Sequence, residues 1–95
     1  MACYLIASVQ ISDAVRFGAY AKAVAGLSER FGGESVVKGP VAQVLEGTGL
    51  PGERIVVTRF ASTQEAKAYI DSPQYQAARK LREGAGVVVM RLVEA

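Results

Sequence analysis

The spacing of apolar residues along this chain switches several times between strict alternation and the spacing of one helix face, which predicts strands and helices in turn. Residues 3–10 are apolar on both alternating faces, so we expect a strand that is covered on both sides. Residues 54–60 and 85–94 have a similar β-prone pattern. Residues 34–46 are predicted as an edge strand with a bulge or bend at Gly39-Pro40, because proline cannot donate to a sheet ladder.

The first predicted helix begins at Ser12 or Asp13, since either side chain could cap it. Its apolar stripe consists of Phe17, Tyr20, Ala21, Val24, Leu27 and Phe31. Gly32-Gly33 follows this stripe and should end the helix, because glycine is common just beyond a helix C-terminus.

The second helical region is predicted to be broken in two. Ser62 and Glu65 have the spacing of a capping box, which starts the first part. Residues 71–73 should end it, because Ser72 can cap a new helix and Pro73 suits the first helical position. The apolar face of the new helix, expected to run to Gly84, consists of Tyr75, Ala78 and Leu81.

The resulting order, β-α-β-β-α-β, predicts an α+β ferredoxin-like fold, in which a four-stranded antiparallel sheet carries its helices on one face. We place Arg59 and Arg91 on the opposite face, because a charge buried beneath helices would need a partner. That face would also expose apolar residues from 3–10, 54–60 and 87–93, and such patches are rare on soluble monomers. We therefore expect a homodimer in which two sheet faces pack together.

A glycine-rich hexapeptide, GTGLPG at positions 47–52, has the spacing of a dinucleotide-binding turn. In that motif the glycines open a helix, whose N-terminus takes the pyrophosphate. Here a β-prone run follows, and Pro51 lies inside the loop. We therefore predict a long hairpin turn that binds no dinucleotide.

Composition restricts the chemistry. Of the 95 residues 51% are hydrophobic, a high share for a small chain, and the net charge of +2 comes from well-mixed signs that indicate neither a nucleic-acid nor a membrane surface. Histidine is absent, which excludes Ser-His-Asp and Cys-His mechanisms within this chain and argues against a metal site. Cys3, the only cysteine, is expected to be a buried small hydrophobe.

The N-terminal residues lack the basic start and long apolar centre of a signal peptide. No apolar run approaches the roughly 20 residues that span a bilayer. The lone cysteine also fits a reducing compartment. We therefore expect a cytoplasmic protein without a membrane segment.

The chain resembles a known family over nearly its whole length, as one domain covering residues 1–95. The residues that carry the resemblance are Tyr20, Gly32-Gly33, Glu46-Gly47, Arg54-Ile-Val-Val, Phe60, Ala66, Tyr69, Asp71-Ser-Pro-Gln-Tyr-Gln76 and Arg82. They are similar to the domain-of-unknown-function family 1330 (DUF1330), within the dimeric α/β-barrel superfamily. The resemblance implies a ferredoxin-like fold whose dimer closes two sheets into a barrel. Relatives in the superfamily include cofactor-free monooxygenases, isomerases and haem enzymes, but haem here would lack a histidine ligand, so we expect no cofactor.

Candidate ligand-binding residues surround a mostly apolar pocket in this interpretation. They are Tyr20, Arg54, Tyr69, Ser72, Tyr75 and Arg82. The helix start at Ser72 offers free N–H groups to an anion, and tyrosine hydroxyls or arginines can orient a carboxylate or polarise a carbonyl. A purely structural alternative stays open, in which Ser72 caps its helix, the tyrosines pack, and the arginines lie at the surface, with Arg79, Lys80 and Arg82 on a solvated helix face.

Two further classes of function share these features. RNA-recognition modules have the same order of elements, but they need aromatic residues on the central strands, and residues 54–60 offer only Phe60. We therefore expect no nucleic-acid partner. A cofactor-free enzyme and a non-catalytic ligand-binding or regulatory homodimer remain open, because both need the same apolar cavity. The ligand, the reaction and any catalytic residue are unknown from the sequence.

Overall fold

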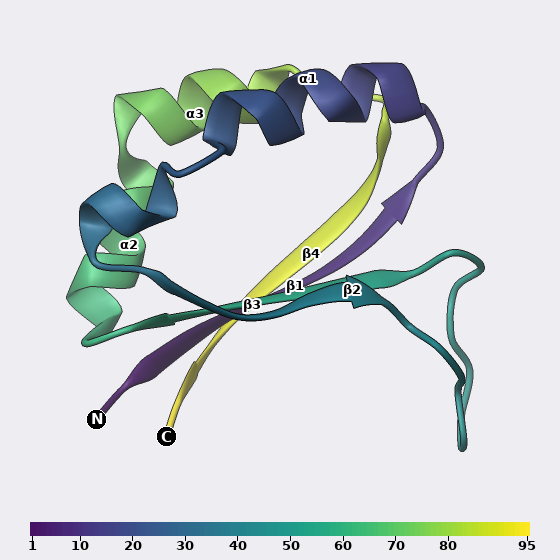
Figure 1. Ribbon diagram of the computed structural model, residues 1–95, viewed down its shortest axis with the longest axis horizontal. Helices are drawn as coiled ribbons and strands as arrows, with labels where there is room; N and C mark the ends of the chain where they lie inside the picture. Colours follow the sequence, from purple (N-terminus) through teal and green to yellow (C-terminus); the bar gives the residue numbers. More distant parts are fainter.

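Four strands form one antiparallel sheet in the order β2-β3-β1-β4 (Figure 1). The computed structural model describes residues 1–95, and the strands are β1 (Cys3–Ile11), β2 (Glu34–Pro40), β3 (Arg54–Phe60) and β4 (Gly86–Glu94). The first strand lies at the centre, between β3 and β4, and β2 lies at one edge. This topology confirms the predicted α+β ferredoxin-like fold.

All helices cover the same side of the sheet (Figure 1). They are α1 (Ala14–Val24), the 3₁₀ helix η1 (Ser28–Phe31), α2 (Thr63–Asp71) and α3 (Pro73–Lys80). Their predicted caps are confirmed, since the backbone N–H groups of Arg16, Glu65 and Tyr75 donate to the side chains of Asp13, Ser62 and Ser72. These caps satisfy donors that a helix start leaves free, which fixes where each helix begins. None of the helices is long and apolar enough to span a bilayer.

Both predicted helical regions end earlier than expected. The first helix ends at Val24 rather than at Phe31, because Gly26 adopts a left-handed φ of 73° and turns the chain. A separate 3₁₀ turn then continues to Gly32, which has a φ of 85° and ends it. In the second region α3 ends at Lys80, and Leu81, expected on the apolar face, is 46% exposed.

The edge strand also differs from its prediction. It ends at Pro40 instead of Glu46, and its register shifts between Ser35 and Val37 instead of at Gly39-Pro40. The edge position itself is confirmed. Beyond the strand, residues 41–53 form a long hairpin loop closed by a hydrogen bond from the Val41 N–H to the Glu53 carbonyl. This loop leads into β3, so the helix that a dinucleotide turn requires does not follow it.

The helices cover one face of the sheet and leave the other face of the chain uncovered (Figure 1). Beneath the helices lie the alternate β1 residues Cys3, Leu5, Ala7 and Val9, all buried, together with Phe60 of β3. Cys3 is 0% exposed, as predicted. The opposite face carries the other half of each strand.

Strand register defines this opposite face, which we call the open face. Its members are Tyr4, Ile6, Ser8, Gln10, Glu34, Val37, Gly39, Ile55, Val57, Arg59, Val87, Val89, Arg91 and Val93. The predicted position of Arg59 and Arg91 is confirmed, because Arg59 lies opposite Tyr4 and Arg91 lies opposite Ile6. Several valines here are substantially exposed, among them Val87 at 54% and Val93 at 43%.

Candidate ligand-binding cavity

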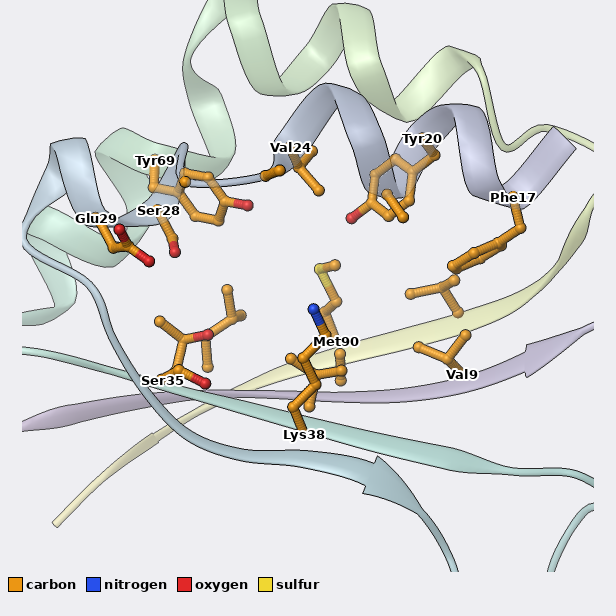
Figure 2. A pocket seen from close by; sticks show the side chains of 18 residues that line it. Val9, Phe17, Tyr20, Val24, Ser28, Glu29, Ser35, Lys38, Tyr69 and Met90 are labelled. Atoms are coloured by element: carbon orange, nitrogen blue, oxygen red, sulfur yellow. The ribbon is translucent and has the colours of Figure 1, made fainter. Parts of the chain in front are cut away.

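A cavity of about 260 Å³ lies between the covered face of the sheet and the α1–η1 segment (Figure 2). Of its 18 lining residues 12 are hydrophobic, so most of its wall would contact the apolar part of an occupant. The floor comes from alternate residues of β1, β3 and β4, and the roof from Phe17, Tyr20 and Val24 of α1. The volume is close to the lower end of the range for small-molecule sites, about 300–1,000 Å³.

The cavity opens at the edge of the sheet. Its lining residues on β2, Ser35 and Lys38, are exposed, and so is Glu29 of η1 across from them. At the opposite, inner part Val9 and Tyr20 are buried. An occupant could therefore enter between η1 and β2 without unfolding a helix.

An aromatic cluster holds the inner wall. The rings of Tyr20 and Tyr69 each pack edge-on against Tyr75, with centroid distances of 6.3 and 5.1 Å. Phe17 packs edge-on against Tyr20 at 5.3 Å, and Phe60 stacks on Tyr69 at 5.9 Å. Such pairs restrict ring rotation, so the hydroxyl groups at their ends are held in fixed positions.

Two of these hydroxyls point into the cavity. Figure 2 shows the hydroxyl groups of Tyr20, from α1, and Tyr69, from α2, directed into the space between helices and sheet. The Tyr69 hydroxyl makes no hydrogen bond within the chain, whereas the Tyr20 oxygen lies 3.2 Å from the Tyr75 oxygen. Tyr69 therefore has both its proton and its lone pairs available to a ligand.

Arg82 and Tyr75 support Tyr20 from behind. The Arg82 Nη1 donates to the Tyr75 hydroxyl at 3.0 Å, and its guanidinium carbon lies 4.6 Å from the centroid of the Tyr20 ring. Tyr75 has one proton, which it can donate to Tyr20 or to the Met90 sulfur at 3.5 Å, but not to both. A ligand acceptor in the cavity would select the arrangement in which Tyr75 donates to Tyr20 and Tyr20 donates to the ligand.

Both cavity tyrosines remain protonated at neutral pH. Burial raises the pKa of Tyr69 from 10.0 to about 12, with a smaller upward effect from Tyr75 and an opposing one from Arg82. Burial, followed by the hydrogen bond to Tyr75, also raises the pKa of Tyr20. These groups are therefore suited to hydrogen bonding with a ligand oxygen and not to removing a proton from it.

The six residues predicted from the sequence take different positions. Tyr20 and Tyr69 line the cavity, and Tyr75, which is 1% exposed, lies behind them. Arg82 contacts this pair, so its assignment to a solvated helix face together with Arg79 and Lys80 is wrong. The remaining two, Ser72 and Arg54, do not line the cavity.

Ser72 is fully engaged within the chain. Its hydroxyl donates to the Tyr69 carbonyl at 2.7 Å and accepts from the Tyr75 N–H at 3.1 Å, and the residue is 6% exposed. It thereby fixes the helix break that places the Tyr69 and Tyr75 rings side by side. Arg54 lies at the start of β3, opposite Val9 and Pro40, and its role in a site stays a prediction.

Sequence reasoning missed the polar groups at the mouth of the cavity. The register shift in β2 places Ser35 opposite Thr58 and Lys38 opposite Val56, so both β2 residues face the helices although they are three positions apart. Strict alternation would have put them on opposite faces. The signal available in the sequence was only the need for a bulge, which we had expected a few residues later.

Metal-ligating residues do not gather anywhere in this structure: no group of three or more histidine, cysteine, aspartate or glutamate side chains lies close enough to hold an ion. That the protein works without a metal stays a prediction.

Several solved structures share this fold. A protein of unknown function from Rhodopseudomonas palustris is 20% identical, with a TM-score of 0.81 over 99% of this chain and 82% of its own. A dimeric ferredoxin-like protein of unknown function from a Jannaschia species is 15% identical, with a TM-score of 0.76 and full coverage of both chains. SnoaB, a cofactor-independent oxygenase from Streptomyces nogalater, is 8% identical, with a TM-score of 0.70 over 99% of this chain and 92% of its own. At these identities the likeness concerns the fold alone.

Comparison by sequence gives one positive result. No curated protein matches this chain. The family model of DUF1330, a domain of unknown function, matches residues 2–95. Since this match spans nearly the entire chain and agrees with the predicted resemblance, the protein belongs to the DUF1330 family.

Proposed function

We propose that the protein binds a small, mostly apolar organic molecule in the cavity between α1–η1 and the sheet. The observation that carries this proposal is the hydroxyl of Tyr69, which points into a mostly apolar cavity and makes no hydrogen bond within the chain. This hydroxyl is accessible from the cavity, so it is free to form a hydrogen bond with an occupant. A ligand with an acceptor oxygen, such as a carbonyl, would supply that bond.

Four of the six predicted residues have a part in this site. Tyr20 and Tyr69 would contact the ligand directly, and Tyr75 with Arg82 would hold Tyr20 in place. Ser72 acts one step further away, through the helix break. Arg54 does not line this cavity, so its part in a site stays a prediction.

We further propose that the protein is a homodimer whose subunits pack through their open faces, closing a dimeric α/β barrel. Support comes from the exposed valines of that face and from neighbours described as dimeric, such as the Jannaschia protein. A second copy would cover apolar surface that the helices of its own chain do not reach. The cavity lies on the other side of the sheet, so each subunit would keep its own site.

The binding proposal is tested by removing single hydroxyl groups. A screen of small ketones, phenols and carboxylic acids by ligand-observed NMR should give binders to the wild type. Tyr69→Phe should weaken the best of them about three- to tenfold, the worth of one hydrogen bond. Because this hydroxyl has no partner in the chain, the variant should fold normally.

Tyr4→Phe is the matched control, since it also loses one hydroxyl but lies on the open face. It should leave ligand affinity unchanged. A ligand bound equally well by wild type, Tyr69→Phe and Tyr20→Phe would place the binding site elsewhere.

Cofactor-free catalysis is a second candidate. It is favoured by the two tyrosine hydroxyls, which could stabilise negative charge that develops on a ligand oxygen during a reaction. SnoaB has a similar fold and is described as a cofactor-independent oxygenase. Incubating each confirmed ligand with protein and following its consumption by mass spectrometry separates an enzyme from a binding protein.

A further inference from the structure

The side chain of Lys38 enters the cavity from the edge strand. Figure 2 shows its ammonium group directed from β2 into the cavity, toward the wall that carries Tyr20 and Tyr69. The β2 register shift places it there, because it sets Lys38 opposite Val56 on the covered face. No other lysine lines this cavity.

The Lys38 ammonium has no partner within the chain: it takes part in neither an ion pair nor a hydrogen bond. The only carboxylate of the lining belongs to Glu29, an exposed residue at the mouth, and it does not pair with Lys38. On the inner side the guanidinium of Arg82 lies behind the Tyr20 ring. Lys38 is therefore the one cation of the lining, its ammonium is directed into the cavity without a partner, and Arg82 adds positive charge behind Tyr20, which favours an anionic group inside.

From this arrangement we propose that the ligand is a monoanionic carboxylate with an apolar body and a second acceptor oxygen. This inference rests on the proposed binding function and specifies its ligand class. The carboxylate pairs with Lys38 near the mouth, the apolar body fills the space between α1 and the sheet, and the second oxygen accepts from Tyr69 or Tyr20.

The hydrogen-bonding capacity of these groups supports this ligand class. An ammonium offers three donors and no acceptor, and each protonated tyrosine can donate one hydrogen bond. A carboxylate and a carbonyl are acceptors only, so they complement such a site. An amine or ammonium ligand would instead face Lys38 with like charge, which disfavours it.

Three probes separate the parts of the proposal. The first is 4-oxo-4-phenylbutyrate, which has a carboxylate, a phenyl ring and a ketone. The second is its primary amide, which has the same shape without the charge. The third is 4-phenylbutyrate, which keeps the charge and lacks the ketone. Their affinities would be measured by ligand-observed NMR titration at low ionic strength, where exposed charge pairs are least screened.

The wild type should bind 4-oxo-4-phenylbutyrate about fivefold more tightly than the amide, as a partly exposed ion pair allows. Lys38→Met should abolish that difference and leave the affinity for the amide unchanged. Lys67→Met, which removes an exposed lysine on α2 away from the cavity, should retain it. The loss of the ketone in 4-phenylbutyrate should weaken binding to the wild type but not to a Tyr20→Phe, Tyr69→Phe double variant.

The remaining outcomes overturn one proposal or both. If the wild type binds acid and amide equally, or if Lys38→Met still prefers the acid, the carboxylate class is wrong while the cavity remains a binding site. NMR can show that the protein is folded and that Tyr20 and Tyr69 lie in the positions described. If neither the acid nor the amide then binds at millimolar concentration, the proposed binding function fails together with this inference.

Discussion

The covered and open faces of the sheet carry side chains from the same four strands, yet these side chains differ in how far they are buried. Cys3 and Leu5 on the covered face are 0% and 6% exposed, whereas Val87 and Val89 on the open face are 54% and 41% exposed. The three α-helices and the 3₁₀ turn cover only one side of the sheet (Figure 1). The comparison shows that burial of an apolar strand residue depends on which side the helices cover, and not on its hydrophobicity.

The faces also differ at particular positions of the central strand. On the central strand the covered face includes the small residues Cys3 and Ala7, while the open face carries Tyr4 and Ile6. Small floor residues beneath a helix layer leave room for a cavity, and Ala7 does line the one described above. The open face combines such larger residues with the exposed valines and with a few polar and charged side chains, among them Arg59 and Arg91, and its apolar part is suited to packing against a second sheet.

We expect the largest effect from a charge placed in the open face, because it should dissociate the proposed dimer. Val89→Asp would bury an ionised carboxylate in the proposed interface, at a cost of several kcal/mol. We expect the dimer dissociation constant to rise by at least about 100-fold, so that light scattering at micromolar concentration gives the mass of one chain instead of two.

The control for this substitution is Val15→Asp, because Val15 is an equally apolar residue that is 86% exposed on α1. This variant should remain dimeric. A wild type that is a stable monomer at micromolar concentration would contradict the dimer itself, and a dimeric Val89→Asp would move the interface away from the open face.

An intermediate effect comes from two strand glycines, one on each face. A Cβ at Gly86, beneath the helices, would collide with the backbone of Gln10, whereas a Cβ at Gly39, on the open face, would meet nothing within 4 Å. Gly86→Ala should therefore lower the free energy of unfolding by about 1–3 kcal/mol, as overpacked sites do.

Gly39→Ala should change the stability by less than about 1 kcal/mol, with stabilisation favoured because alanine restricts the unfolded chain. Urea unfolding of both variants at one protein concentration measures the difference. Equal losses for the two variants would mean that the covered face tolerates a shift of β1 against β4.

The smallest effect concerns alkaline pH and the covered face alone. The folded-state pKa of Tyr69, about 12, lies above the unfolded value of 10.0, so the unfolded state loses its proton first. The contribution of protonated Tyr69 to the free energy of unfolding is therefore fully present below pH 10 and is lost as the pH rises from 10 to 12. Thermal unfolding followed across this window should show a fall in stability that is shallower in Tyr69→Phe. An unchanged slope in that variant would place the Tyr69 hydroxyl in water.

Local sequence signals predicted most of the fold. The caps at Asp13, Ser62 and Ser72 act within three residues of themselves, so they could be recognised without knowledge of the rest of the chain. Alternation likewise predicted the open-face positions of Arg59 and Arg91, because the strands that carry them are regular.

The candidate site was predicted only in part. Tyr20 and Tyr69 were recognised as polar groups on apolar helix faces, and both line the cavity. For Arg82 the sequence predicts either a ligand-binding residue or a solvated helix face, and no local pattern indicates that its side chain reaches Tyr20 and Tyr75.

What the sequence by itself determined was the set of elements, their order and the two apolar faces of the sheet, since these follow from periodicity and from caps that act over a few residues. Only the tertiary structure decided that Lys38 enters the cavity, because the position of the β2 register shift depends on pairing with β3, more than 15 residues later in the chain. The meeting of Tyr20 with Tyr75 likewise joins residues 55 positions apart. Contacts over such separations are set by how the helices pack on the sheet, and no local pattern encodes them.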